Sequence, residues 1–290
     1  MSSEARATRS ASISDWGHYV KRVTLALAAL AVSALLATPA LASKAAGPSV
    51  KKAGQLMVGL SLPSPGFQTG TFRGTDVQNP KGMEVEMGQL IAAKLGIKTV
   101  RFYNVSNFSN IYSSAPKPYD FALAEVTITP ARAKAVAFSV PYYNANQGVL
   151  IRKGLSPVPT SIADLKNLVL CAQTGTTGAD FIKSKIRPSK PALFPSTTTI
   201  MYQQVQSGRC DASVYDAPIL GGQKATKPSA YGPIVGQITT GEQYGMVFEK
   251  GSKLLPQVNA ILKTWKTDGT ISRLAKKYLT TDVSKLPIFK

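Results

Sequence analysis

The sequence predicts an α/β fold whose two lobes face each other. Strand-like and helix-like segments alternate in each half of the 290-residue chain, a pattern typical of sheets covered by helices. No long linker separates the halves, and near-continuous apolar runs at 148–151 and 244–248 can serve as strands that cross between the lobes. With 44% apolar and 17% charged residues, the chain is long enough for two domains of ordinary size.

The first half of the chain predicts a strand–helix–strand unit. A strand is expected at 55–61, a turn at 63–66 and a loop at 70–81, where Gly, Thr, Asn and Pro dominate. A helix capped by Gly96 follows, because apolar residues recur at helical spacing: Met83, Met87, Leu90, Ile91 and Leu95. Strands at 97–103 and 119–124 complete the unit and favour a parallel sheet.

The second half repeats the alternation. The expected elements are, in order, a short helix at 162–166 capped by Ser161, a strand at 169–172, helices at 176–184 and 198–207, a strand at 212–216, and helices at 254–267 and 271–279. Gly208 follows the helix at 198–207, and Asp268-Gly269 separates the last two helices. Two units of the same kind indicate two lobes.

The first 42 residues have the pattern of an export signal. Lys21 and Arg22 precede an uncharged run at 23–37, and Ala40 and Ala42 form the A-x-A pattern of a cleavage site. The apolar run is shorter than the roughly 20 residues that a membrane-spanning helix needs. We therefore predict a signal peptide at 1–42, a flexible leader at 43–54 and a periplasmic protein. An uncleaved N-terminal anchor is the alternative.

The composition favours binding over catalysis. The only histidine of the sequence, His18, lies in the predicted signal peptide, so the mature chain would contain none. That excludes a Ser-His-Asp triad, a Cys-His dyad and the usual zinc sites. We therefore expect no enzyme activity, no metal site and no cofactor.

The chain is strongly basic. Its formal net charge is +19, and removal of the four basic and two acidic residues of segment 1–42 leaves +17. Such a charge is compatible with nucleic acid, an anionic membrane or acidic ligands. However, Lys and Arg are scattered, without a run of five or six and without interleaved aromatic residues. We interpret them as a cationic surface and expect no nucleic-acid partner.

The two cysteines, Cys171 and Cys210, each lie beside a short apolar run. In an exported protein, an even pair of cysteines is expected to form a disulfide. Two separate buried thiols are the alternative.

Three charged or polar features are expected at strand ends, where ligands of open α/β sheets bind. Arg132 follows the strand at 119–124 and a hydroxyl-rich turn, and its planar guanidinium suits a carboxylate. The segment 173–178, Gln-Thr-Gly-Thr-Thr-Gly, opens a helix and can attract an anion, although it is no phosphate-binding loop. Asp216 ends the strand at 212–216 and can receive an ammonium group.

Each feature also has a structural interpretation. Arg132 could pair with a nearby acid on the surface, the 173–178 segment could be an ordinary capped helix, and Asp216 could cap a helix N-terminus. Taken together, a cation, an anion hole and an anion at strand ends fit a zwitterion. An α-amino acid carries both charges on one carbon.

The chain resembles the family 3 extracellular solute-binding proteins, the amino-acid-binding subunits of bacterial ABC importers. The resemblance covers residues 55–280 and rests on the order and spacing of these short segments: Val58-Gly59, Gly82-Met-Glu-Val-Glu86, Thr127-Ile-Thr-Pro-Ala-Arg132, Phe138-Ser-x-Pro-Tyr-Tyr143, Gly175-Thr-Thr177, Gly208-Arg-Cys-Asp211, Tyr215-Asp-Ala-Pro218 and Asp268-Gly-Thr270.

The resemblance implies a type II periplasmic-binding-protein clamp. In that fold, two parallel or mixed sheets flanked by helices are joined by two hinge strands. Residues 55–146 would form the first part of lobe 1, residues 147–240 lobe 2, and residues 241–290 a C-terminal return to lobe 1.

The resemblance also implies the roles of individual residues. Arg132 would bind the ligand α-carboxylate, helped by Thr127 and by the amide of Thr177. Asp216 would receive the α-ammonium, together with the backbone carbonyl of Glu125. Phe108 stands where an aromatic residue stacks on the ligand side chain.

Some residues depart from the family pattern. Ser61 stands where members that bind basic amino acids often have Asp, and Ser64 stands where an aromatic lid residue is usual. Glu125 replaces a small residue and could point into the cleft or into solvent. Gln173 could bind a polar side chain. A polar amino acid or close derivative is favoured, while basic, amide and acidic ligands stay open.

The expected function is therefore binding of an amino acid by a monomer, which closes on it and delivers it to the permease subunits of an ABC importer. A cyclohexadienyl dehydratase-like lyase on the same scaffold is the alternative. That activity would need a general acid in the cleft, and Glu125 is the one unusual carboxylate available.

Overall fold

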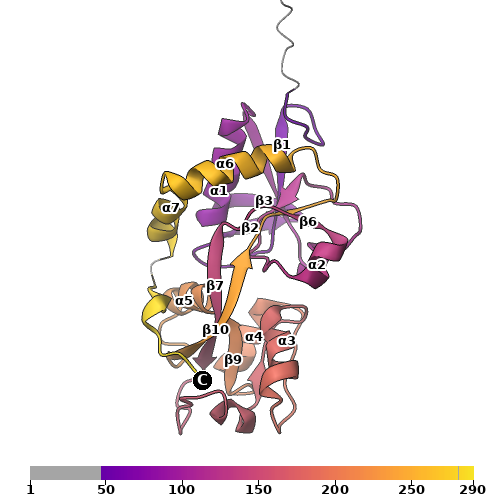
Figure 1. Ribbon diagram of the computed structural model, residues 1–290. Coiled ribbons are helices and arrows are strands. Elements are labelled where there is room, and N and C mark those ends of the chain that lie inside the picture. Colours follow the sequence, from indigo (N-terminus) through magenta and orange to yellow (C-terminus); the bar gives the residue numbers. More distant parts are fainter. Residues whose placement is uncertain (1–46, 280) are drawn as a thin grey trace, which may run out of the picture. The chain divides into compact units, whose positions relative to one another are not determined.

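In the computed structural model of the protein, residues 47–279 and 281–290 are described. The predicted signal peptide and the first residues of the predicted leader lie outside the described residues. Within the described part, the strands form two sheets, each covered by helices, and each sheet is the centre of one lobe (Figure 1). None of the helices described is both long and apolar enough to span a membrane.

The sheet of the first lobe has seven strands in the order β2-β3-β4-β1-β5-β11-β6. The central strands β1 (Gln55–Leu60), β4 (Thr99–Asn104) and β5 (Phe121–Ala122) are parallel. Strand β11 (Val247–Phe248) joins β5 and β6 (Ala137–Phe138) in the antiparallel sense. The predicted parallel sheet is therefore confirmed at the centre and is mixed at its edges.

The predicted loop at 70–81 is wrong. It forms a hairpin of β2 (Thr69–Arg73) and β3 (Asp76–Lys81) at the edge of the sheet. The residues of this hairpin are mostly exposed, and an edge strand tolerates the polar residues and the proline that suggested a loop. Gly74, with φ of +60°, makes the turn between the two strands.

Helices cover both faces of the first sheet. Helix α1 (Met83–Lys94) lies on one face with α6 (Leu255–Thr267) and α7 (Thr270–Tyr278). Gly96, at φ +70°, follows the C-terminus of α1 as predicted. The opposite face is covered by α2 (Pro130–Ala135) and the short turn η1 (Phe108–Asn110).

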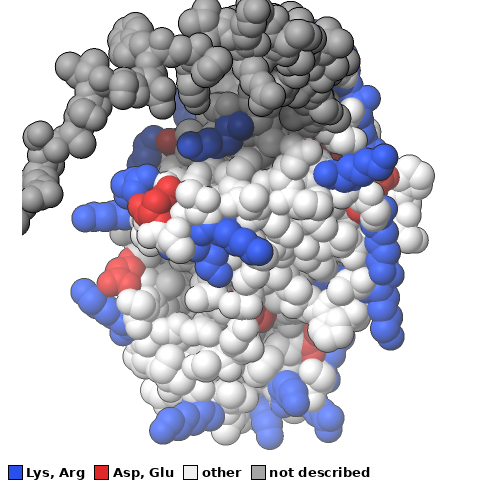
Figure 2. Space-filling view, turned by 45° about the horizontal axis from the view of Figure 1, so that its top comes forward, with Lys and Arg blue, Asp and Glu red and all other residues white. Residues whose placement is uncertain are grey.

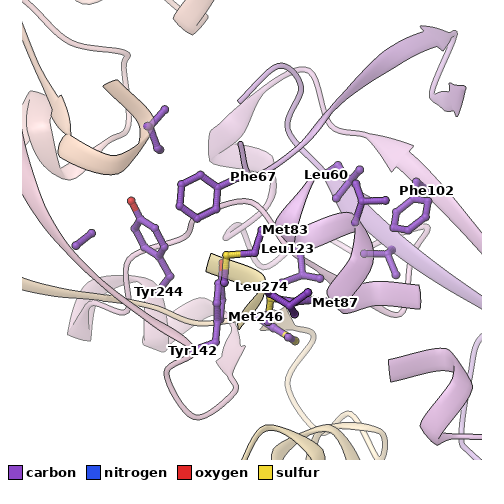
Figure 3. Close-up of a cluster of buried hydrophobic side chains, with 14 of the residues drawn as sticks. Leu60, Phe67, Met83, Met87, Phe102, Leu123, Tyr142, Tyr244, Met246 and Leu274 are labelled. Atoms are coloured by element: carbon purple, nitrogen blue, oxygen red, sulfur yellow. The ribbon is translucent and has the colours of Figure 1, made fainter. Parts of the chain in front are cut away.

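Alternating side chains of β1 enter two apolar clusters. Leu56, Val58 and Leu60 enter the larger cluster, and Met57 enters the one on the opposite face. A sheet buried on both faces requires apolar residues throughout, which explains the near-continuous apolar sequence of β1. Figure 3 shows part of the larger cluster, including Leu60, Met83, Met87, Phe102 and Leu123.

The sheet of the second lobe has four strands in the order β10-β7-β9-β8. Strand β9 (Ala212–Asp216) is parallel to β8 (Leu170–Cys171) and antiparallel to β7 (Tyr143–Ile151). The helical segments of this lobe are η2 (Asp164–Asn167), α3 (Thr177–Phe181), η3 (Ile182–Ile186), α4 (Thr198–Gln206) and α5 (Ala217–Thr226). The residue before η2 is Ala163 rather than the predicted cap Ser161, although the Ser161 hydroxyl accepts a hydrogen bond from the amide of Asp164, the first residue of η2.

Two long antiparallel strands, β7 and β10 (Ile234–Tyr244), run between the lobes (Figure 1). The predicted crossing at 148–151 is the last part of β7, where the strand already pairs with β9 in the second sheet, and the one at 244–248 contains only the last residue of β10. The chain crosses along β10, and the apolar pair Val247–Phe248 already belongs to the first sheet. Polar residues such as Thr239, Thr240 and Gln243 hid β10 in the sequence, because this strand is half exposed.

The C-terminal segment contacts both lobes. Helices α6 and α7 pack on α1 in the first lobe. The last residues instead lie against the second lobe, where Phe289 is buried in the core with only 3% of its surface exposed. The amide of Gln237 donates to Pro287 O and that of Phe289 donates to Gln237 O, both at 2.8 Å. The tail thus makes a further connection between the lobes.

The end of the predicted flexible leader is held against the first lobe. The amide of Lys51 donates to Asp120 Oδ1 at 2.6 Å, and the Lys51 ammonium pairs with Glu249 at 2.6 Å. Asp120 also accepts from the amide of Met57 in β1. One buried carboxylate therefore fixes both the entry of the chain and its first strand.

The predicted disulfide is confirmed. Cys171 in β8 and Cys210, just before β9, are bonded, with their Cα atoms 6.0 Å apart. Both residues are fully buried. The bond encloses α3 and α4, and it therefore ties the helical side of the second lobe to its sheet.

Candidate functional site

A cavity lies between the lobes and is lined by residues of both. It contains about 420 Å³ of space not occupied by atoms, part of which is open to solvent. Lining residues from the first lobe are Ser61, Pro63, Ser64, Phe108, Ala124, Glu125, Thr127 and Arg132, and those from the second are Thr176, Thr177, Thr198, Tyr215, Asp216 and Ile219. All but one of the predicted site residues are therefore brought together.

The exception is Gln173, which does not line the cavity. Its side chain is buried within the second lobe, where Nε2 donates to Ser196 O and Oε1 accepts from the hydroxyl of Tyr215, both at 3.0 Å. Gln173 therefore positions Tyr215, which does line the cavity. The Tyr215-Asp-Ala-Pro218 segment was the available signal for that tyrosine.

Arg132 lies at the cavity with 8% of its surface exposed. Thr129 caps α2 and so places Arg132 in the first helical turn. The guanidinium donates to Thr127 O at 2.8 Å and, across the gap between the lobes, to Gly175 O at 3.0 Å. It also lies over the ring of Tyr112, 4.5 Å from the centroid. These contacts use two of five N–H donors and leave others for a ligand.

Gly175 is required where the lobes meet. Its φ is +79°, and a Cβ at this position would lie 2.6 Å from the Tyr112 hydroxyl of the opposite lobe. That hydroxyl donates to Gly175 O at 2.8 Å. The glycine of the 173–178 segment therefore permits close approach of the lobes, which is a second role beside opening helix α3.

Asp216 ends β9 and is 5% exposed. It precedes α5, but its side chain makes no capping hydrogen bond. The alternative that Asp216 caps the N-terminus of a helix is therefore wrong. Instead its carboxylate accepts from Gln147 Nε2 and from the Tyr244 hydroxyl, both at 2.6 Å. Burial, and then the charge of Glu242, raises the pKa of Asp216 to about 7. A neighbouring cation would therefore stabilise the charged form of Asp216.

Thr127 and Thr177 face each other across the cavity, and both bind Glu242. Their hydroxyls donate to Glu242 Oε2 at 2.7 and 2.6 Å, and Gln147 Nε2 donates to its Oε1 at 2.9 Å. No pattern in the sequence pointed to Glu242, because it lies on strand β10, which was not predicted. Thr177 is also the first residue of α3, where a backbone amide has no partner within the helix.

Glu125 lines the cavity and is only 7% exposed, so its side chain is not directed to solvent. Behind it lies Glu84 of α1, which is fully buried and accepts from the amide of Glu125 at 3.0 Å and from the hydroxyl of Tyr142. Burial raises the pKa of Glu84 to about 7. Burial, and then the charge of Glu84, raises the pKa of Glu125 well above its usual value.

The remaining predicted residues, Ser61 and Phe108, also line the cavity. The amide of Ser61 donates to Gln68 Oε1 at 2.8 Å. Phe108 is 8% exposed and its ring centroid lies 5.6 Å from the guanidinium carbon of Arg132. Within residues 47–279 and 281–290, no three acidic, histidine or cysteine side chains come together as metal ligands.

A family model described as bacterial extracellular solute-binding proteins, family 3, matches residues 56–281. The chain belongs to this family. The L-cystine-binding protein TcyJ of Escherichia coli K12 is 27% identical over 92% of this chain and 98% of its own length. This solute-binding protein therefore spans nearly the whole of that relative.

Solved structures confirm the type II fold of this solute-binding protein. An ancestral arginine-binding protein bound to glutamine is 30% identical with a TM-score of 0.69, covering 78% of this chain and 98% of its own. The ancestral amino acid-binding protein AncCDT-1, a precursor of cyclohexadienyl dehydratase, is 29% identical with a TM-score of 0.67, covering 78% and 95%.

Proposed function

We propose that this solute-binding protein binds a free amino acid between its lobes and delivers it to the permease subunits of an ABC importer. The observation that carries the proposal is the pair Arg132 and Asp216. These opposite charges come from opposite lobes and line one cavity. The α-carboxylate would bind Arg132 together with the Thr177 amide, and the α-ammonium would bind Asp216.

The available hydrogen bonds suffice for the affinity that such a protein needs. Each charge-assisted hydrogen bond to a desolvated group contributes roughly 1.5–3 kcal/mol, and micromolar binding needs about 8 kcal/mol net. Four or five bonds meet that need, after the loss of ligand freedom, if water is excluded. The contact between Arg132 and Gly175 already holds the lobes together, so a ligand that adds contacts to both would stabilise the closed form.

Delivery to a permease implies a location outside the cytoplasm. The A-x-A cleavage pattern at Ala40 and Ala42 supports export. The relative TcyJ is likewise named as a binding protein. Closure would present a different surface to the membrane subunits than the open form does. We propose that the mature protein acts in the periplasm as a monomer.

A titration of ligand-free protein tests the proposal. Protein unfolded in denaturant, dialysed and refolded would be titrated calorimetrically with each amino acid, including arginine, glutamine and cystine. We expect at least one to bind with micromolar or tighter affinity. No heat with any amino acid, from protein shown to be folded by circular dichroism, would refute amino-acid binding.

The alternative of a lyase rests on Glu125, whose raised pKa would let it act as a general acid in the cavity. The likeness to AncCDT-1 makes the test worthwhile. Arg132 and Asp216 both line the cavity and suit an intact amino-acid head group, which supports binding instead. Incubation with prephenate and arogenate should give no product; turnover of either would favour the lyase.

A further inference from the structure

The charges around the cavity do not balance. Arg132 is the only Lys or Arg among its lining residues, while Glu125 and Asp216 line it and Glu84 and Glu242 lie directly behind. This acidic interior contrasts with a chain of formal net charge +19, whose visible surface in Figure 2 carries scattered Lys and Arg. A simple zwitterion would satisfy Arg132 and Asp216 and leave the other carboxyls uncompensated.

The carboxyl groups differ in how well hydrogen bonds satisfy them. Glu242 accepts three bonds, from two hydroxyls and an amide. Among the described residues, the carboxylate of Glu125 has one donor in regular hydrogen-bond geometry, Gln68 Nε2, at 3.1 and 3.2 Å from its two oxygens. The same nitrogen also lies 2.8 Å from Glu84 Oε2. Glu84 has two further donors, the amide of Glu125 and the hydroxyl of Tyr142, so sharing the Gln68 amide leaves Glu125 as the carboxyl with too few donors for a buried negative charge.

The backbone also holds Glu125 in place. Its φ is +47°, a left-handed conformation that is unusual for a residue other than glycine, and its amide donates to Glu84. The hydroxyl of Ser64, which lines the cavity and is 4% exposed, lies beside Glu125 and makes no regular hydrogen bond within the described residues. A polar ligand group at this end of the cavity would supply hydrogen bonds to the side chains of both Glu125 and Ser64.

We propose that the ligand carries a second positive charge, which Glu125 receives, and that this charge replaces a proton shared by Glu125 and Glu84. The inference rests on the proposed function and assigns the ligand to the cationic amino acids or their close derivatives. Without ligand, two adjacent desolvated carboxyls hold at least one proton between them. When a cation arrives at Glu125, that proton leaves to solvent.

The other titratable groups around Glu125 and Glu84 do not change the difference in proton release between a cationic and a neutral ligand. Tyrosines that face it have pKa values raised well above 10 by burial, and they stay neutral: Tyr142, Tyr202, Tyr215 and Tyr244. Arg132 stays charged. Asp216 also releases a proton when an ammonium binds, but every α-amino acid causes that release equally.

The test compares arginine with glutamine, which has a neutral side chain of similar length. Calorimetry at pH 7.5 in phosphate and in Tris, whose ionisation enthalpies differ, counts the protons released on binding. We expect arginine to bind at least tenfold more tightly and to release about half a proton or more beyond glutamine. Equal proton release, or tighter binding of glutamine, would overturn the inference while glutamine binding itself would support the proposed function.

Variants separate the role of each carboxyl. Glu125→Gln should weaken arginine binding at least tenfold and change glutamine binding little. Glu84→Gln should reduce the extra proton release, since it removes the charge that raises the pKa of Glu125. Glu86→Gln, on the same helix but paired with Lys277 at the surface, is the matched control and should change neither. If Glu125→Gln does not fold, the proton count of the unmodified protein decides. An unchanged arginine affinity in a folded Glu125→Gln would refute the inference.

Discussion

Arg132 and Gly175 come from opposite lobes, and the guanidinium Nη2 of Arg132 lies 3.0 Å from the carbonyl oxygen of Gly175. The side chain that we assign to the ligand carboxylate is therefore also a contact that closes the clamp. Ligand binding and lobe closure share this one group, so each is expected to strengthen the other.

Replacing Arg132 should weaken ligand binding without unfolding the protein. Arg132→Ala removes the charge for the carboxylate and the bond to Gly175, and we expect affinity to fall at least 30-fold, or about 2 kcal/mol. Arg132→Lys keeps the charge but not the planar fork and should be intermediate. Calorimetry gives the affinities, and Arg101→Ala, which breaks an exposed ion pair with Asp76, is the control. Identical titration curves for Arg132→Ala and the parent would contradict the assignment.

Glu242 is expected to oppose binding of the ligand carboxylate. Its carboxylate occupies the position between the hydroxyls of Thr127 and Thr177, and its charge adds to the raised pKa of Asp216. Glu242→Gln removes that charge, so it should strengthen ligand binding several-fold at pH 8 and lower the pKa of Asp216. Affinity measured from pH 6 to 9 tests both effects. Weaker binding across that range would show that Glu242 helps to hold the ligand.

The unliganded protein should lose stability as the pH rises through neutrality. Glu84 and Asp216 have pKa values of about 7 when folded, above the ordinary value of about 4 in the unfolded chain. The folded state therefore holds protons more tightly, and its advantage is lost as pH rises through 7. Between pH 5.5 and 8 the loss is about 2 kcal/mol for each carboxyl.

Urea unfolding at both pH values measures this loss, and Asp216→Asn should reduce it. Carboxyls whose pKa is lowered by pairing, such as Glu86 and Glu249, act in the opposite direction only at lower pH. Their contribution is lost as pH falls through their folded pKa values. An unliganded protein that is more stable at pH 8 than at pH 5.5 would contradict the pKa directions.

How much the sequence could predict depended on where each residue lies. Arg132 and Asp216 follow apolar strands, so the rule that ligands meet strand ends predicted their place at the cavity, which both line, while their binding roles stay a prediction. The sequence analysis assigned no role to Glu84, because its burial depends on tertiary contacts with Gln68 and Tyr142 that no local pattern shows. Glu242 was missed because its polar, half-exposed strand lacks an apolar pattern.

The disulfide should contribute substantially to stability. Cys171 and Cys210 are 39 residues apart, and on the chain-entropy model closing such a loop contributes about 4 kcal/mol. The double variant Cys171→Ala, Cys210→Ala should therefore unfold at a lower urea concentration. Its free energy of unfolding should be lower by roughly that amount. Mass spectrometry of the purified, unreduced protein should show the two peptides linked. Free thiols at both positions would contradict the bond, and equal stability of the double variant would contradict its contribution.

A crystal structure of the protein with the amino acid that binds best in the calorimetric panel tests the central claim most directly. The account predicts the ligand carboxylate on Arg132 and the Thr177 amide, and the α-ammonium on Asp216, with the lobes closed around it. A bound ligand that touches neither Arg132 nor Asp216 would contradict it.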